Sequence, residues 1–169
     1  HSHILPKEMP NWFDKFGYGD FIQLIQKQNN TADMMQGGKF FRTISENCWN
    51  EDLRIKEYQT KNTSVQVVCT IPVMFSYWAK GEDCLELSRF LNDHIADLTA
   101  RYPKNYIGLA TLPMQDPELA IKELERSKKI GFPGIQIGSN INQMNLSEQQ
   151  DKIVKAEQEK ENILVLACP

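Results

Sequence analysis

Two of the three histidines in this 169-residue sequence are His1 and His3, which are separated by a single serine. In a β-strand, residues two positions apart point to the same side, with Cα atoms roughly 6.6 Å apart. Two imidazoles placed in this way can bind one metal ion at about 2.0–2.1 Å each, while Ser2 faces the other way. Because Pro6 would soon end such a strand, the pattern predicts a metal site at a strand end. The spacing alone is a weak signal, and a chance pair or a tag remnant is the alternative interpretation.

A regular alternation of strand-like and helix-like segments begins at residue 64. Continuous apolar, β-branched runs indicate buried strands, and apolar residues at helical spacing indicate amphipathic helices. Asp116 before Pro117 is typical of a helix N-cap and its first turn. The expected strands are 64–73, 105–114, 131–139 and 163–167, and the expected helices are 82–102, 116–130 and 147–162.

This alternation predicts an α/β fold with parallel strands and right-handed crossovers. No GxGxxG motif follows any expected strand, so the sequence lacks the signature of a dinucleotide-binding fold. We expect the widely spaced glycines Gly131, Gly134 and Gly138 to lie in turns and bulges. A (β/α)8 barrel needs about 250 residues, so the chain would form a partial TIM barrel. Residues 10–63 break the alternation and are interpreted as an inserted segment, at the end of the barrel where loops contact substrates.

Composition excludes several classes of protein. Hydrophobic residues make up 41% of the sequence and charged residues 24%, a composition typical of globular proteins. The net charge is −3, and the sequence has no block of basic residues that could bind nucleic acid. No apolar run approaches the roughly 20 residues that a membrane span needs, and no signal peptide is evident, so we expect a cytosolic protein. The four cysteines match no zinc or redox motif and are expected to be reduced and mostly buried. The first residue is not methionine, from which we expect that an upstream segment is missing.

Several stretches of the chain resemble one enzyme family. They are HSHILPKE, FGYGDFIQL, GKFFRTISENCW, PVMFSYWAK, and IGLATLPMQDPELAIKELER followed by GFPGIQIG. The sequence is similar to the 2-amino-3-carboxymuconate-6-semialdehyde decarboxylases, a family of the metal-dependent amidohydrolase superfamily. The resemblance runs along nearly the whole chain, residues 1–169, but covers only about the amino-terminal half of the family's length. It implies one (β/α)8 barrel domain of the amidohydrolase type, of which this chain would be the amino-terminal half.

The resemblance also implies a site and a reaction. His1 and His3 would be two ligands of a Zn²⁺ cofactor, and Arg42 would hold a carboxylate of the substrate. Arginine suits that role because its planar guanidinium pairs bidentately with carboxylates. The reaction would be non-oxidative decarboxylation of the dicarboxylate semialdehyde in the kynurenine pathway of tryptophan catabolism, which limits the formation of quinolinate and NAD. Full-length members would form homodimers. Residues expected to line or support the pocket, with a purely structural role as the alternative, are Phe40, Phe41, Trp49, Met74, Phe75, Tyr77 and Trp78.

Two departures from the family pattern keep other functions open. Cys168 stands where the family has a third zinc histidine, and it is either a substitute ligand or a divergent end. The family's second-half ligand and base are absent, no catalytic base is assigned, and His94 is expected to be a structural histidine of a helix. The alternatives are therefore a catalytically inactive fragment or pseudo-enzyme, and a related amidohydrolase-superfamily decarboxylase or hydrolase with another substrate. We expect the 169-residue chain on its own to be inactive and either poorly soluble or self-associated.

Overall fold

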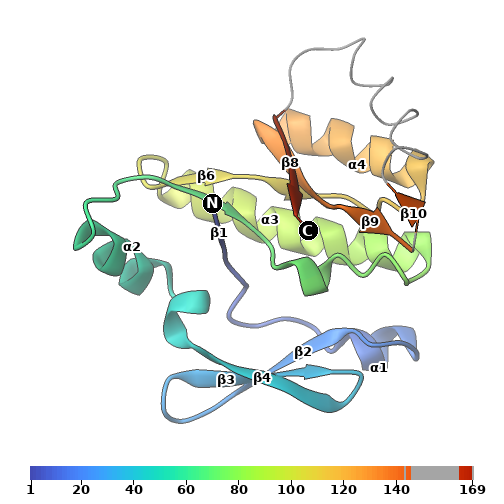
Figure 1. Cartoon of the computed structure of the whole chain (residues 1–169), viewed down its shortest axis with the longest axis horizontal. Helices are drawn as coiled ribbons and strands as arrows, with labels where there is room; N and C mark the ends of the chain where they lie inside the picture. The colour runs from blue at the N-terminus through green and yellow to red at the C-terminus, as the bar shows by residue number, and fades with distance from the viewer. Residues whose placement is uncertain (143, 146–163, 169) are drawn as a thin grey trace.

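The computed structural model describes residues 1–142, 144–145 and 164–168. Its central feature is a set of short parallel strands. β1 (Ser2–His3) pairs with β5 (Gln66–Cys69), which pairs with β6 (Tyr106–Gly108). β7 (Ala110–Thr111) follows β6 after a single residue and pairs with β8 (Gly134–Gly138), which pairs with β11 (Leu164–Cys168). The predicted alternation of parallel strands and helices is confirmed (Figure 1).

The expected strand 105–114 is shorter than predicted and changes partner in its middle. Val68 of β5 lies opposite Gly108, whereas Ile135 of β8 lies opposite Ala110. In this register Pro133 would face Gly108, and proline has no backbone N–H to continue the ladder. The expected strand 64–73 is also shorter, because Pro72–Met74 forms a 3-10 turn, η2.

Two long helices cover one side of these strands. α3 (Gly81–Arg101) and α4 (Pro117–Ile130) lie close to the predicted ranges, whereas the expected helix 147–162 lies outside the described residues. The Asp116 side chain accepts a hydrogen bond from the Leu119 N–H at 3.1 Å, so the predicted N-cap is confirmed. Gly131 ends α4 in the left-handed region with a φ of 110°, a conformation that glycine adopts without steric cost.

The helices bury one face of the strands and leave parts of the other exposed. Val68, Ala110 and Ile137 pack with Ile95 and Leu98 of α3 in the first hydrophobic core. On the opposite, inner face, the side chains of Val65, Ile107 and Leu164 remain 46%, 42% and 58% exposed. Ile135 belongs to the core beneath the helices, and Gln136 takes the alternate position on the strand.

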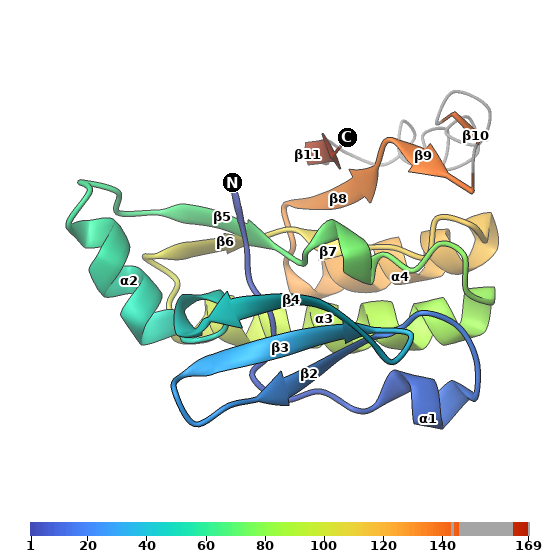
Figure 2. The ribbon, with the colours of Figure 1, turned by 60° about the horizontal axis from the view of Figure 1, so that its bottom comes forward.

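Residues 10–63 form a second structural unit. α1 (Trp12–Phe16) leads into an antiparallel sheet of β2 (Ile22–Gln26), β3 (Thr31–Gln36) and β4 (Lys39–Ser45). A 3-10 turn, η1 (Glu46–Cys48), and α2 (Glu51–Gln59) then return the chain to β5. Ile22 and Met34 of this sheet pack with Met74 and with Leu87 of α3 in a second core, so α3 contacts both units (Figure 2).

After β8 the chain turns back in the short hairpin of β9 (Asn140–Ile141) and β10 (Met144–Asn145). Among the described residues, no helix has the length and apolar character of a membrane span.

Candidate metal and substrate site

The two amino-terminal histidines lie close together at the end of β1. The centroids of the His1 and His3 rings are 5.4 Å apart, and the rings meet edge to face. His3 lies opposite Cys69, the last residue of β5, so it sits where neighbouring strands end, and His1 directly precedes β1. This is the end of a parallel α/β structure at which ligands bind.

The environment of His3 prepares one of its ring nitrogens for a metal. Its Nδ1 lies 2.9 Å from the Thr70 carbonyl oxygen, to which it can only donate, so Nε2 is left with a free lone pair. Burial lowers the pKa of His3, partly opposed by this same hydrogen bond, and so favours the neutral imidazole that binds metals. The two imidazoles and the carbonyl behind His3 therefore fit part of a metal centre.

The described residues do not complete that centre. Among them, no three His, Cys, Asp or Glu side chains are grouped so that they could hold a metal ion. Cys168 is buried at the end of β11, where its Sγ accepts a hydrogen bond from Gln136 Nε2 at 2.9 Å, and the structure does not bring it into a three-ligand group with His1 and His3. Burial raises the pKa of Cys69, the cysteine nearest to His3, to about 12, so its sulfur is a protonated thiol.

Arg42 lies on the face of the inserted sheet that is turned toward the rest of the molecule. It is opposite Met34, a buried residue of the second core. The register shifts between Met34 and Met35, so Phe41 is an extra residue of β4, and such bulges re-aim the side chains next to them. The Arg42 guanidinium lies 4.7 Å from the Phe41 ring and has no hydrogen-bond or ion-pair partner among the described residues.

An indirect path connects Arg42 to the histidines. Burial raises the pKa of Cys48, and the charges of Arg54 and Arg42 partly oppose this effect. The Cys48 carbonyl accepts a hydrogen bond of 2.9 Å from Leu5 N–H, two residues after His3. The predicted carboxylate-binding residue and the predicted ligands thus come from different units of the fold that meet beside η1, without direct contact between them.

A pocket of about 360 Å³ opens at the carboxyl end of β8. Of the seven hydrophobic residues expected to line or support the active site, Phe75, Tyr77 and Trp78 line this pocket, and Trp49 and Met74 are buried in the structure. Phe40 is 62% exposed and lies outside the pocket lining. The polar lining residues Gln36, Ser139, Asn140 and Asn142 were missed, although polar residues directly after the strand 134–138 are a sequence signal for this end of a sheet.

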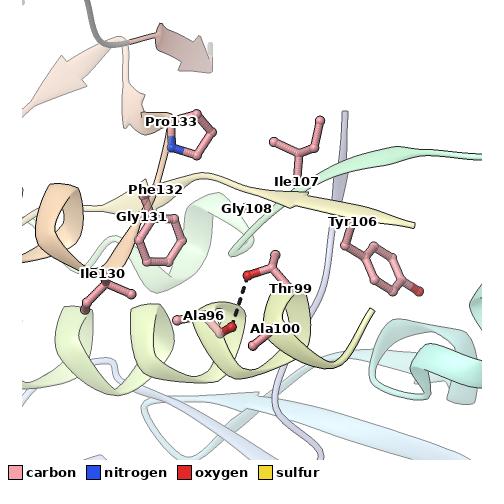
Figure 3. A pocket seen from close by; sticks show the side chains of 10 residues that line it. All are labelled: Ala96, Thr99, Ala100, Tyr106, Ile107, Gly108, Ile130, Gly131, Phe132 and Pro133. Carbon is pink, nitrogen blue, oxygen red and sulfur yellow. Dashed lines mark hydrogen bonds between the residues drawn. The ribbon is translucent and has the colours of Figure 1, made fainter. Parts of the chain in front are cut away.

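A larger cavity, of about 490 Å³, lies where the strands begin and so at the other end of the sheet (Figure 3). Ile107 and Phe132 line it, and the Thr99 hydroxyl on its wall already donates to the Ala96 carbonyl at 3.0 Å. Its lining contains no His, Cys, Asp, Glu, Lys or Arg, and the hydroxyl of Tyr106 on its wall donates to the Glu51 carbonyl at 3.0 Å, so we place the candidate site at the histidine end. His94 lines neither pocket, and burial lowers its pKa beside Arg101 of the same helix.

Comparison with known proteins identifies the relatives of this chain. No protein-family model matches it. Over 149 residues the chain is 50% identical to the 2-amino-3-carboxymuconate-6-semialdehyde decarboxylase of Dictyostelium discoideum, an alignment that covers 88% of this chain and 42% of the relative. The chain is homologous to the 2-amino-3-carboxymuconate-6-semialdehyde decarboxylases. It spans less than half the length of the curated relatives that it matches.

Solved structures support the same assignment of the fold. A 5-carboxyvanillate decarboxylase from Novosphingobium aromaticivorans, crystallised with manganese, matches with a TM-score of 0.62 at 27% identity, over 68% of this chain and 34% of that protein. A protein described as an amidohydrolase II matches all of this chain and 49% of its own, with a TM-score of 0.70 at 16% identity. The strands and helices described above are thus part of an amidohydrolase-type barrel, as the sequence predicted.

Proposed function

We propose that the full-length protein to which this chain corresponds catalyses the non-oxidative decarboxylation of 2-amino-3-carboxymuconate-6-semialdehyde. The observation that carries the proposal is the 50% identity to the Dictyostelium discoideum decarboxylase over most of the chain. The arrangement of His1, His3 and Arg42 supports it, because two neighbouring imidazoles and one unpaired guanidinium suit a metal-dependent reaction on a carboxylate substrate.

Each residue would have a separate task. His1 and His3 would supply two nitrogen ligands to a divalent metal, with the Thr70 carbonyl fixing the orientation of the His3 ring. A bound metal ion of this kind supplies Lewis acidity and lowers the pKa of a water molecule. Arg42 would bind a carboxylate of the substrate in a bidentate manner and so fix its orientation relative to the histidines.

We propose zinc as the metal, since a histidine pair suits it, with manganese as the competitor because the Novosphingobium aromaticivorans decarboxylase was crystallised with that metal. In a cell the reaction would take place in the cytosol and divert tryptophan-derived carbon away from quinolinate, and the full-length enzyme would be a homodimer.

The test is to purify a full-length chain that carries residues 1–169, determine its metal content, and measure carbon dioxide release. Turnover of 2-amino-3-carboxymuconate-6-semialdehyde that is lost with a chelator and restored by zinc is the expected result. A protein that is active on 5-carboxyvanillate instead would overturn the substrate assignment. A folded, metal-loaded protein with no activity on either compound would favour the pseudo-enzyme alternative.

A further inference from the structure

The pocket at the end of β8 is uncharged. Its described lining residues include aromatic rings, amides and hydroxyls, but no Lys, Arg, His, Asp or Glu. Placing a carboxylate in such surroundings without a cationic partner costs several kcal/mol, whereas a carbonyl oxygen needs only a hydrogen-bond donor. The lining therefore favours a neutral, carbonyl-bearing part of a ligand.

The pocket offers donors that the protein itself does not use. Gln36 projects into it from the end of β3, and its side-chain amide has no hydrogen-bond partner among the described residues. The Tyr77 hydroxyl accepts a hydrogen bond from the Gly138 N–H at 3.2 Å, and its own proton has no acceptor in the part of the chain that the structure describes. Asn142, in contrast, is held in place, because its Nδ2 donates to the Tyr77 carbonyl at 2.8 Å.

One wall of the pocket is a flat aromatic ring held by the inserted unit. The Trp78 ring lies 4.7 Å from the Phe21 ring, between centroids. It also lies so close to Gly19 that a Cβ atom there would come within 2.1 Å of the indole, and Gly19 has a φ of 81°. Glycine is required at this position for both reasons, and the result is an indole face 42% exposed beside the pocket. Such a face suits a planar, conjugated ligand.

The neutral donor and the free cation lie on one surface. Gln36 and Met34 are two residues apart on β3 and so share a face of the sheet, and Arg42 lies opposite Met34. Diagonal neighbours in a regular antiparallel sheet are about 7–8 Å apart, and the extra residue Phe41 adds to that spacing here, so Gln36 and Arg42 are placed to contact opposite ends of one small molecule.

We propose that this uncharged pocket binds the aldehyde end of the substrate, with Gln36 as a donor to the aldehyde oxygen, while Arg42 holds a carboxylate. The inference rests on the proposed function, and it assigns the two ends of the substrate to two sets of residues. It also makes the pocket a specificity element. A compound with a third carboxylate in place of the aldehyde would bring a negative charge to a lining without a cationic side chain, since Lys39, which lies opposite Gln36 in the sheet, is not among the lining residues.

The experiment uses the full-length protein and two ligands, the semialdehyde substrate and its analogue oxidised at C6 to a carboxylate. Turnover of the first and competitive inhibition by the second are measured for the wild type and for Gln36→Lys. The added cation should tighten binding of the analogue about 10- to 150-fold relative to the semialdehyde, the range expected for one charge-assisted hydrogen bond. Gln36→Met, which lacks the donor, should raise KM for the semialdehyde with kcat and metal content nearly unchanged.

Gln23→Lys is the matched control, because Gln23 lies opposite Met35 on the other face of the same sheet. If Gln36→Lys and Gln23→Lys change the preference between the two ligands equally, the inference is wrong. If Gln36→Lys does not fold, Asn140→Lys adds the same charge at an exposed residue of the pocket lining, and an unchanged preference there would also overturn the inference. Absence of semialdehyde turnover in the wild type would instead refute the proposed function, while inhibitor binding measured by calorimetry would still test the pocket.

Discussion

The parallel strands and the inserted sheet of this molecule are built differently and supply different groups to the candidate site. β5 has four residues, three of them fully buried, and it is held between other strands and the helices. β4 has seven residues, nearly all exposed, and it forms an edge of its sheet. β1, which pairs with β5, presents the His3 imidazole, and the Thr70 carbonyl holds that ring from behind. The edge strand presents Arg42, whose charge is unpaired.

This difference indicates a division of tasks. A metal ligand must be held in one orientation, which requires a second hydrogen bond and a packed surrounding. A group that binds a charged substrate must be accessible and must not be neutralised by the protein's own carboxylates. We therefore expect mutations in the parallel strands to affect metal content, and mutations in the inserted sheet to affect substrate binding.

The largest effect is expected from loss of a histidine. In a full-length chain, His3→Ala should remove most of the metal and lower activity by more than about 100-fold. Mutating a residue that only supports a metal ligand already lowers metal affinity or activity by about 10–100-fold, and loss of the ligand itself should have a larger effect. Metal content by atomic emission and the decarboxylation rate are measured together. Ser2→Ala, on the opposite side of the same strand, should keep both. Stoichiometric metal in His3→Ala would exclude His3 as a ligand.

Arg42→Lys should leave the metal in place and reduce kcat/KM. Lysine keeps the charge but loses the bidentate geometry, and a charge-assisted hydrogen bond contributes about 1.5–3 kcal/mol, which corresponds to roughly 10- to 150-fold. Lys61→Ala, which removes an exposed cation that follows α2 in the inserted unit, is the control. Equal kcat/KM values for the wild type and Arg42→Lys would show that Arg42 is only a surface charge.

The parallel strands and their helices could largely be predicted from the sequence, because the residues that start and end these helices act on close neighbours in the chain. The Asp116–Pro117 start and the Gly131 end of α4 depend on neighbours within one helical turn, and both are found in the structure. The start of the pairing between β7 and β8 was not predictable in the same way, because it depends on Pro133, a residue distant in sequence from β7 that cannot extend the ladder to Gly108.

The inserted unit shows the limit of sequence reasoning more clearly. Residues 10–63 could be recognised as an interruption, but not as an antiparallel sheet, since its register depends on pairs between β2, β3 and β4. The face on which Arg42 lies depends on the extra residue Phe41, and a shift of one residue would have turned Arg42 to the other face. The role of Gln36 was missed for the same reason, because its neighbours in the pocket come from distant segments of the chain.

The exposed inner face of the parallel strands predicts self-association of the 169-residue chain when it is expressed alone. Val65 and Ile107 lie on neighbouring strands and are nearly half exposed, which forms an apolar patch. Ile107→Ser should weaken association by about tenfold, since burying part of an isoleucine contributes roughly 1.5 kcal/mol. Ile25→Ser, at a residue that is 46% exposed on the inserted sheet, should change it less. Sedimentation at several concentrations measures both, and a monodisperse wild-type monomer would contradict the prediction.

The smallest effect concerns the contact between the two units. α2 of the inserted unit meets the end of α3 through an ion pair of Glu51 with Arg101 and a 2.8 Å hydrogen bond from the Tyr102 hydroxyl to Asp52. His94 lines the pocket between them. Burial lowers the pKa of His94, and Arg101 adds to this effect, whereas Glu51 and Asp97 oppose it. Lys7, Glu46 and Asp52 also face this pocket.

The sign of the resulting pH dependence follows from proton binding. Because the pKa of His94 is lower in the folded chain than its usual value of about 6.5, the unfolded chain binds this proton more readily. The contribution of His94 to stability is therefore fully present above about pH 6.5, and it is lost as the pH falls through the lowered pKa of the folded state. In the full-length protein, His94→Gln should reduce the loss of stability between about pH 7.5 and 5.5, measured by urea unfolding, because glutamine takes up no proton. Glu125→Gln, an exposed change on α4, should leave the pH dependence as in the wild type. An unchanged pH dependence in His94→Gln would show that this contact between the units does not depend on the neutral histidine.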